Sequence, residues 1–279
     1  MSCNYSCNYC PFSKYPKSER KIQKDRAQWF RFVSFLEKQQ DFNGAVQVVP
    51  YGEVLLYDFY WEGLARLSQC TGIDAVGAQS NFSFSVSKML SVYLKHGGIR
   101  EKLRLWGTFH PQMTTLSQFC AQCEQLHKNQ ILFSTGAVGD PKNLSIICQL
   151  RQCLPPEIYL WINRMDGRPH PYTSEEYQAF SSIDPYFFLE CRHYPADTTQ
   201  CQSAFFVDCN GDLFGCNLSK KRIGNLYEHP ALLTRPKQPD DCSRSECCCF
   251  LAYAQRDDIK KLTAFGTYPA FRIPSQTQS

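Results

Sequence analysis

Three cysteines within the first ten residues have the spacing of an iron–sulfur loop. Cys3, Cys7 and Cys10 form a C-x3-C-x2-C pattern, and a loop of this spacing can wrap so that all three thiolates face one cubane. A [4Fe–4S] cluster usually takes four protein thiolates, so three leave one iron open for chemistry. Zinc is the main rival, but structural zinc takes four ligands in paired C-x2–4-C units. A zinc site here would need a fourth ligand from far along the chain.

The elements that must position this loop alternate between strands and helices from residue 45 to about 180. Repeated strand–helix units imply a parallel sheet, and right-handed crossovers curl such a sheet into an open or closed barrel. Sites of barrels lie in the loops that follow the carboxyl ends of the strands. Hydrophobic periodicity predicts strands at 45–49, 73–76, 103–109, 131–135 and 158–163, and helices at 19–38, 54–69, 85–95, 116–127 and 143–153.

After residue 180 the pattern changes to short strands and turns. Asn210-Gly211 separates strand-like runs at 203–207 and 212–214 and predicts a β-hairpin. We therefore expect a barrel domain over 1–182, a cysteine-rich extension over 183–260 and a C-terminal tail over 261–279.

The composition is that of an ordinary globular protein, with 279 residues of which 43% are hydrophobic and 20% charged. The net charge of +4 is spread along the chain, so it gives little support to nucleic-acid binding. No apolar run is long enough to cross a bilayer and no signal peptide is recognisable, so we expect a cytoplasmic protein. Thiols stay reduced there, so clustered cysteines indicate metal ligands or catalytic groups. The isolated cysteines Cys70, Cys120, Cys148 and Cys153 are expected to pack as small hydrophobic side chains.

The segment 3–12, Cys-Asn-Tyr-Ser-Cys-Asn-Tyr-Cys-Pro-Phe, resembles the signature loop of the radical S-adenosylmethionine (radical SAM) superfamily, with the aromatic Tyr9 before the last cysteine. The resemblance implies that S-adenosylmethionine chelates the open iron of a [4Fe–4S] cluster. Electron transfer then releases a 5′-deoxyadenosyl radical, which abstracts a hydrogen from the substrate. The electron would come from a donor such as flavodoxin or ferredoxin.

Segments at later strand ends extend the resemblance. Tyr51-Gly52-Glu53 is similar to the family's Gly-Gly-Glu-type turn, apart from its first residue, which implies that Glu53 and nearby backbone receive the ammonium group of the cofactor. Trp-Gly-Thr-Phe-His-Pro at 106–111 resembles a subfamily motif and places His110 at the barrel mouth, in contact with substrate or cofactor or in a structural role. The residues that the resemblance assigns to cofactor binding are Tyr9, Gly52, Glu53, Ser80, Asn81 and, in a glycine-flanked segment against the adenine, Val138.

One departure concerns the start of the barrel. In the family a first strand precedes the cysteine loop, whereas this loop begins at Cys3. We expect that strand to lie upstream of the recorded start or to be supplied in another way. The predicted fold is thus α/β, a partial (β/α)6 TIM-type barrel without its first strand, followed by a small hairpin-containing extension.

That extension resembles the twitch or SPASM segments of radical SAM enzymes, because Ile223-Gly224-Asn225 follows the cysteine-bearing hairpin. The resemblance implies a second, auxiliary [4Fe–4S] cluster held by Cys201, Cys216, Cys242 and either Cys247 or Cys249, with a four-thiolate zinc site as the alternative. It favours a peptide substrate, with a small molecule second. A non-enzymatic zinc protein that binds nucleic acid or protein is the competing function.

Overall fold

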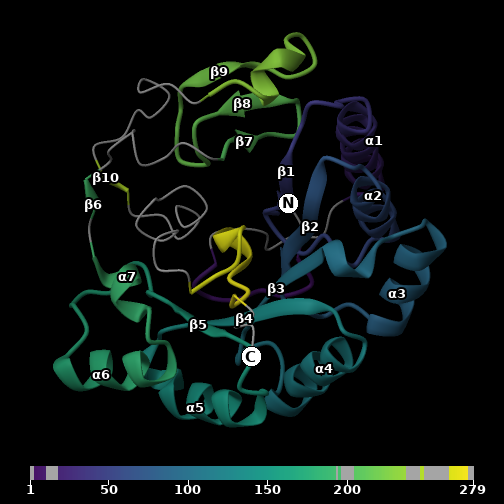
Figure 1. Cartoon of the computed structure of the whole chain (residues 1–279). Coiled ribbons are helices and arrows are strands. Elements are labelled where there is room, and N and C mark those ends of the chain that lie inside the picture. Colours follow the sequence, from purple (N-terminus) through teal and green to yellow (C-terminus); the bar gives the residue numbers. More distant parts are fainter. Residues whose placement is uncertain are drawn as a thin grey trace.

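Five parallel strands form the central sheet, in a computed structural model that describes residues 3–10, 18–192, 194–195, 204–236, 246–247 and 264–275. Every strand pairs with the next one along the chain, and the curved sheet carries helices on its outer side (Figure 1). The strands are β1 (Gly44–Val48), β2 (Ile73–Ser80), β3 (Leu103–Phe109), β4 (Leu132–Val138) and β5 (Leu160–Asn163). All five strands predicted from the sequence are therefore present, and they run parallel as the alternation with helices requires.

Helices connect the strands, and local sequence explains where several of them begin. Ser85 accepts a hydrogen bond from the Lys88 N–H at the start of α3, and Thr115 and Gln118 form a reciprocal capping box at the start of α4. Thr115 is thus the cap of α4. The helices are α1 (Glu19–Leu36), α2 (Asp58–Ser68), α3 (Val86–Lys95), α4 (Leu116–Lys128), α5 (Leu144–Cys153), α6 (Ser174–Ile183) and α7 (Phe187–Cys191).

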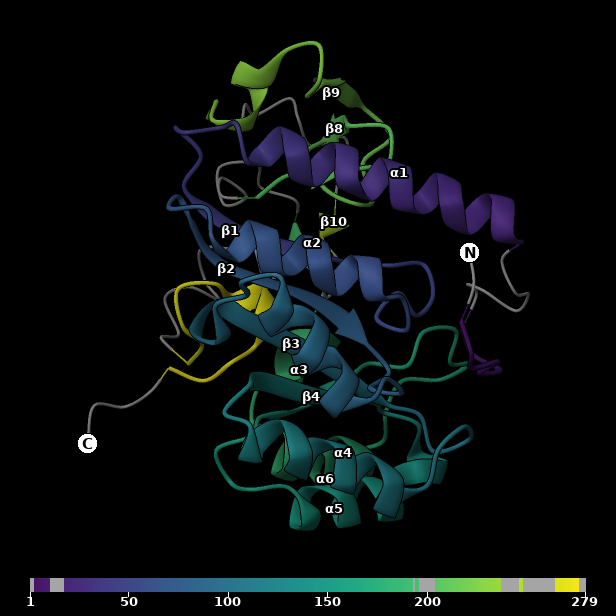
Figure 2. The ribbon, with the colours of Figure 1, turned by 90° about the vertical axis from the view of Figure 1, so that its right-hand side faces the viewer.

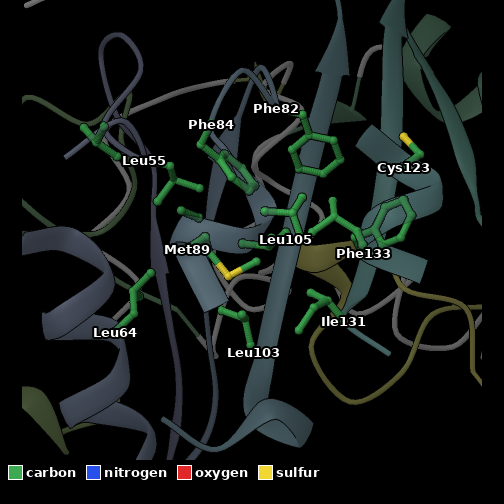
Figure 3. Packing of buried hydrophobic residues seen from close by; sticks show 14 of the residues in the cluster. Leu55, Leu64, Phe82, Phe84, Met89, Leu103, Leu105, Cys123, Ile131 and Phe133 are labelled. Carbon is green, nitrogen blue, oxygen red and sulfur yellow. The ribbon is translucent and has the colours of Figure 1, made fainter. Parts of the chain in front are cut away.

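The main hydrophobic core lies between the outer face of the sheet and the helices (Figure 3). Alternate residues of β3 point into it, and Leu103, Leu105 and Phe109 are each 0% exposed. α1 adds Trp29, Val33 and Leu36, which recur at helical spacing along one face. Burial of a side chain of this size contributes about 1.5–3 kcal/mol, so this layer supplies much of the stability of the fold.

The inner face of the sheet is more polar and is packed against the segment 264–275. The Ser134 hydroxyl donates to the Phe271 carbonyl at 2.8 Å, and the Arg272 guanidinium lies 3.2 Å above the centre of the Trp161 ring. Arg272 is 1% exposed and faces Glu190 at 3.7 Å. In Figure 2 this yellow segment, with the short helix η7 (Pro269–Phe271), enters at the end of the sheet opposite the N-terminal loop. It is part of the core of the barrel.

The predicted hairpin is present in a second small sheet. β7 (Phe206–Val207), β8 (Asp212–Phe214) and β9 (Arg222–Asn225) pair antiparallel, and Gly211 in the turn has a φ of +86°, which favours glycine. The sheet contacts α1, where Arg31 lies 3.8 Å from the Tyr227 ring centre. A separate pair joins β6 (Tyr194–Pro195) to β10 (Glu246–Cys247).

Apart from shifts in strand ends, three features differ from the sequence prediction. α2 begins at Asp58 rather than at residue 54. The residues before it form a turn in which the Leu55 carbonyl accepts a hydrogen bond from the Trp61 indole N–H. α6 and α7 were not predicted, although α6 has a capping box formed by Thr173 and Glu176.

No helix in the described ranges is long and apolar enough to cross a membrane.

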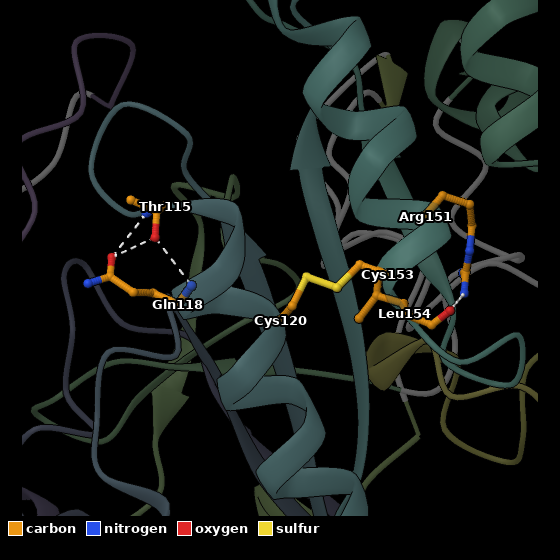
Figure 4. Close-up of a disulfide and its surroundings, with 6 residues drawn as sticks. All are labelled: Thr115, Gln118, Cys120, Arg151, Cys153 and Leu154. Atoms are coloured by element: carbon orange, nitrogen blue, oxygen red, sulfur yellow. Dashed lines mark hydrogen bonds between the residues drawn. A yellow bond between two sulfur atoms is a disulfide. The ribbon is translucent and has the colours of Figure 1, made fainter.

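The third difference concerns two cysteines that were expected to pack as separate thiols. Cys120 on α4 and Cys153 at the end of α5 form a disulfide, with their Cα atoms 6.4 Å apart (Figure 4). The helices are neighbours on the outer layer, which brings together residues 33 positions apart. Sequence spacing alone does not indicate this pairing, because it depends on how the two helices pack.

Candidate active site

The loop of residues 3–10 lies at the carboxyl ends of the strands, on the side to which the β2 arrow points in Figure 2. The Asn81 amide donates to Asn4 Oδ1 at 3.0 Å, and the Asn4 amide donates to the Ser83 hydroxyl at 2.9 Å. The Asn8 N–H donates to Gln112 Oε1 at 3.5 Å. These bonds hold the loop to the turns that follow β2 and β3, as expected for a barrel site.

The three predicted cluster cysteines lie together. Burial raises the pKa of the Cys3 thiol and raises that of Cys7 to about 11, and charge on Cys10 raises both further. The Cys10 N–H donates to the Cys7 carbonyl at 3.1 Å, which closes the turn between them. Mutual repulsion of this kind means that the three thiolates need a shared cation to be stable together.

The sulfur of Cys3 also has two hydrogen-bond donors. The Tyr5 backbone N–H lies 3.4 Å from it and the Asn81 amide nitrogen 3.7 Å from it. Donors of this kind favour the thiolate, the form that binds metal.

The described residues can also be compared with the ligand sets of single metal ions. Among the residues that the structure describes, no three His, Cys, Asp or Glu side chains are grouped so as to hold one metal ion. The thiolates of a cubane each bind a different iron and therefore stand farther apart than the ligands of one ion. Cys3, Cys7 and Cys10 stand on one short loop, and the charge on Cys10 affects the other two thiols.

Glu53 lies beside this loop, in the turn after β1. Gly52 has a φ of +136°, which favours glycine, and leads into a carboxylate that is 2% exposed. Glu53 Oε2 accepts from the Ser80 hydroxyl at 3.0 Å and from the Asn81 N–H at 2.6 Å, while Oε1 accepts from the Leu55 N–H at 3.0 Å. The structure thus brings together four of the residues predicted to bind the cofactor.

Burial dominates the electrostatics of Glu53. It raises the pKa of the carboxyl group to about 7, although the three hydrogen bonds oppose the shift. The charge of Glu53 in turn raises the pKa of Cys3, which places the carboxylate next to the cysteine loop. A carboxylate has about four acceptor sites, and these hydrogen bonds occupy three of them.

Tyr9, also predicted to bind the cofactor, contacts His110 at the end of β3. The Tyr9 hydroxyl lies 2.5 Å from His110 Nδ1, and the two rings stack with their centres 5.9 Å apart. The edge-on Tyr5 ring lies 6.0 Å from the same imidazole. Burial lowers the pKa of His110 to about 4, so the imidazole is neutral near pH 7. The sequence left two roles open for His110, contact with substrate or cofactor and a structural role. The structure shows that His110 contacts the cysteine loop through Tyr9 and Tyr5.

Val138 ends β4, one strand beyond His110. The following Gly139 donates its N–H to the Asn163 carbonyl at 2.8 Å and accepts from the Tyr172 hydroxyl at 2.7 Å. Burial is the main cause that raises the pKa of Tyr9, and the charge of Asp140 adds to it, so the β4 end also lies near the loop. Tyr172 and Asp140 were not predicted from the sequence. They lie in the loops after β5 and β4, where polar residues are common and do not by themselves indicate a site.

The second group of cysteines lies largely outside the described residues. Cys216 is half-buried between β8 and β9, and Cys209 is exposed beside the hairpin turn. Cys201 and Cys242 fall outside the described ranges, and Cys247 is described only through the backbone pairing of β10. The auxiliary ligand set therefore stays a prediction.

Comparison with known proteins rests on solved structures. No protein-family model and no curated protein matches the sequence. The structure of native anSMEcpe with bound AdoMet matches with a TM-score of 0.54 at 12% identity, over 83% of this chain and 77% of that one. This chain shares its fold with anSMEcpe. The form of native anSMEcpe with bound AdoMet and Kp18Cys peptide also matches with a TM-score of 0.54 and 12% identity, over 97% of this chain and 84% of that one.

A third match, a histidine-tagged form of anSMEcpe with bound AdoMet, has a TM-score of 0.51 and 12% identity, over 83% of this chain and 74% of that one. The likeness spans more than two thirds of each chain in all three cases. At this identity it shows a common fold, and the chemistry has to be argued from the residues of the site.

Proposed function

We propose that the protein is a radical SAM enzyme. The observation that carries the proposal is the C-x3-C-x2-C loop, whose three thiols gather at the carboxyl ends of the strands beside the buried Glu53. The fold shared with anSMEcpe, a protein with bound AdoMet, supports it. A [4Fe–4S] cluster held by Cys3, Cys7 and Cys10, once reduced by one electron, would supply with S-adenosylmethionine a 5′-deoxyadenosyl radical for hydrogen abstraction from the substrate.

Some residues of this chain would bind the cluster and others would orient the cofactor. Cys3, Cys7 and Cys10 would hold the cluster, with the Asn81 amide donating to the Cys3 thiolate. Glu53 would accept the cofactor's ammonium group at its remaining acceptor site. The same carboxylate, fixed by Ser80 and the Asn81 N–H, keeps the turns after β1 and β2 in place.

Anaerobic reconstitution tests the proposal. With iron and sulfide, the protein should turn brown and bind about four irons per cubane, or about eight if the auxiliary cluster is present. After reduction it should cleave S-adenosylmethionine to 5′-deoxyadenosine. Cys7→Ala should abolish cleavage, while Cys148→Ser, a change to a half-buried cysteine on α5, should not. A colourless protein with stoichiometric zinc contradicts the proposal and favours the non-enzymatic zinc protein.

For the substrate we propose a peptide. The match to anSMEcpe with bound Kp18Cys peptide, which covers 97% of this chain, favours it over the small-molecule alternative. An auxiliary cluster on Cys201, Cys216, Cys242 and Cys247 or Cys249 would assist, and a flavodoxin or ferredoxin in the cytoplasm would supply the electron. Cys216→Ala should leave uncoupled cofactor cleavage intact while halving the iron content. Equal loss of cleavage in the Cys7 and Cys216 variants argues against two separate clusters.

A further inference from the structure

Two exposed hydrophobic side chains lie in the turn that contains Glu53. Among the described residues, large hydrophobic side chains are exposed at Tyr51 (45%), Leu56 (38%) and Leu94 (40%). Tyr51 and Leu56 belong to the turn between β1 and α2, whereas Leu94 lies near the carboxyl end of α3, where the chain has returned to the amino ends of the strands. Exposed apolar side chains that gather at one place indicate an interaction surface, while a single one is common.

The first turns of α1 lie beside the turn of Tyr51 and Leu56. The Tyr60 hydroxyl, in the first turn of α2, donates to Asp25 Oδ1 at 3.2 Å. Arg66 pairs with Glu37 at 2.7 Å at the other end of α2, so the two helices run in the same direction. The residues of α1 that precede position 25 therefore extend past the start of α2, next to the turn before it. Figure 2 shows this end of α1 on the side of the cysteine loop.

This end of α1 is positively charged. Arg20, Lys21 and Lys24 are exposed, and none of them forms an ion pair with another described residue. Residues 19–26 contain four basic and two acidic residues, which gives a net charge of +2. Asp58, the carboxylate that begins α2, is already paired with Lys88 at 2.7 Å. An apolar part with a basic margin has the make-up of a protein interface. The basic–apolar surface is defined as Arg20, Lys21, Lys24, Tyr51 and Leu56.

A short path of hydrogen bonds joins this surface to the cysteine loop. Glu53, in the same turn as Tyr51 and Leu56, accepts from the Asn81 N–H at 2.6 Å. The Asn81 amide nitrogen lies 3.7 Å from the sulfur of Cys3. Because the rate of electron transfer falls steeply with distance, a redox protein that docks over this turn is well placed to reduce a cluster held by the loop.

We propose that the basic–apolar surface is the docking site of the electron donor, a small redox protein with an acidic surface, such as an acidic flavodoxin. The inference rests on the proposed function, in which one electron leaves the reduced flavin of the donor and reduces the cluster. Complementary charge speeds the encounter and fixes the orientation of the partners. A substrate would have to pass the buried Glu53 turn to reach the cluster from this side, whereas an electron can cross it.

The test compares two reductants on the full-length, reconstituted protein. Lys21→Glu combined with Lys24→Glu should lower the rate of 5′-deoxyadenosine formation driven by a reduced, acidic flavodoxin roughly tenfold at low salt, and calorimetry should show weaker binding of that flavodoxin. High salt should shrink this loss, because it screens the charges. With dithionite, a small reductant that needs no docking, the same variant should keep the wild-type rate. Leu56→Ala should weaken flavodoxin binding at low and high salt alike.

A matched control changes the same residue types at the other end of the molecule. Lys95→Glu combined with Leu94→Ala alters an exposed cation and an exposed leucine on α3, and it should keep the wild-type affinity for flavodoxin. Glutamate in the first turns of α1 complements the helix dipole, so the variant at positions 21 and 24 should fold.

The outcomes separate this inference from the proposed function. A wild-type protein that forms no 5′-deoxyadenosine with dithionite contradicts the function itself. If dithionite works, the docking site is overturned by a flavodoxin that does not reduce the wild type, by wild-type flavodoxin binding in both surface variants, or by an equal loss in the control. A loss with dithionite as large as with flavodoxin overturns it too, because the surface would then serve the cofactor or a peptide substrate.

Discussion

The amide nitrogen of Asn81 lies 3.7 Å from the sulfur of Cys3, although the two residues are 78 positions apart in the sequence. The same amide donates to Asn4 Oδ1, and its own oxygen accepts from the Ser83 N–H and hydroxyl. Asn81 therefore fixes the cysteine loop and favours the Cys3 thiolate at the same time. Its contribution to cluster binding can be measured separately from that of the cysteines.

If the loop holds the proposed cluster, Asn81→Ala should weaken retention of iron, because it removes the donor to Cys3 together with the bond that holds Asn4. A hydrogen bond to a charged group contributes about 1.5–3 kcal/mol, which corresponds to a roughly tenfold or larger loss of affinity. The rate of iron release to a chelator measures it. Asn8→Ala is the matched control, because Asn8 contacts Gln112 through its backbone N–H only. Iron release as slow as in the wild type would show that Asn81 does not support the cluster.

Glu53 should make stability depend on pH. Its folded pKa of about 7 lies above the ordinary value of 4.5, so its stabilising contribution is complete below 4.5 and is lost as the pH rises through 7. A shift of this size amounts to on the order of 3 kcal/mol. Urea unfolding of the apo protein between pH 4.5 and 8 should show the decline, and Glu53→Gln should flatten it.

The pKa of Asp184 is also raised, so Asp184 also makes stability fall as the pH rises, and its contribution must be separated from that of Glu53. Burial raises the pKa of Asp184 to about 6, so its contribution is lost about one pH unit lower than that of Glu53. Asp184→Asn should flatten only the lower part of the curve. If Glu53→Gln leaves the decline near pH 7 unchanged, Glu53 is not the group responsible.

Much of the scaffold could be predicted because its signals are local. The five strands are apolar runs separated by helical periodicity, and the capping residue Thr115 lies next to the helix it begins. The cysteine loop was found from the spacing of three residues. These features depend on neighbours in the sequence, so one sequence is enough to recognise them.

The contacts that define the site are long-range and were not predictable. The pairing of Tyr9 with His110 and the three bonds that occupy Glu53 depend on which strand ends the curved sheet brings together. The sequence reasoning treated Glu53 only as a cofactor ligand, since no local pattern reveals its bonds to Ser80 and Asn81. Arg272 was overlooked because it lies within residues 261–279, which were predicted to be a C-terminal tail.

The disulfide between Cys120 and Cys153 predicts a redox-dependent stability. It closes a loop of 33 residues, and disulfides over such loops stabilise by about 2–4 kcal/mol. Reductant should lower the free energy of unfolding by this amount, and Cys120→Ser should lower it equally and remove the response to reductant. Cys148→Ser on the same helix pair is the control. Finding both thiols alkylated in the oxidised protein by mass spectrometry would rule the bond out.

Arg272 should anchor the C-terminal segment inside the barrel. Its side chain is 1% exposed, lies 3.7 Å from Glu190 and stacks on Trp161 and Trp106. Removal of one partner from a buried ion pair costs about 3–5 kcal/mol, because the other charge stays buried. Arg272→Met should therefore destabilise the protein by this amount in urea unfolding.

A double-mutant cycle shows whether the ion pair is the cause. Glu190→Gln alone should also destabilise, because it removes the negative charge that faces the Arg272 guanidinium at 3.7 Å and weakens the bond to the Trp161 indole N–H. The double variant should be less destabilised than the sum of the two single changes, since neither charge is then left buried alone. Additive losses would mean that Arg272 acts through its stacking on the two indoles and not through Glu190.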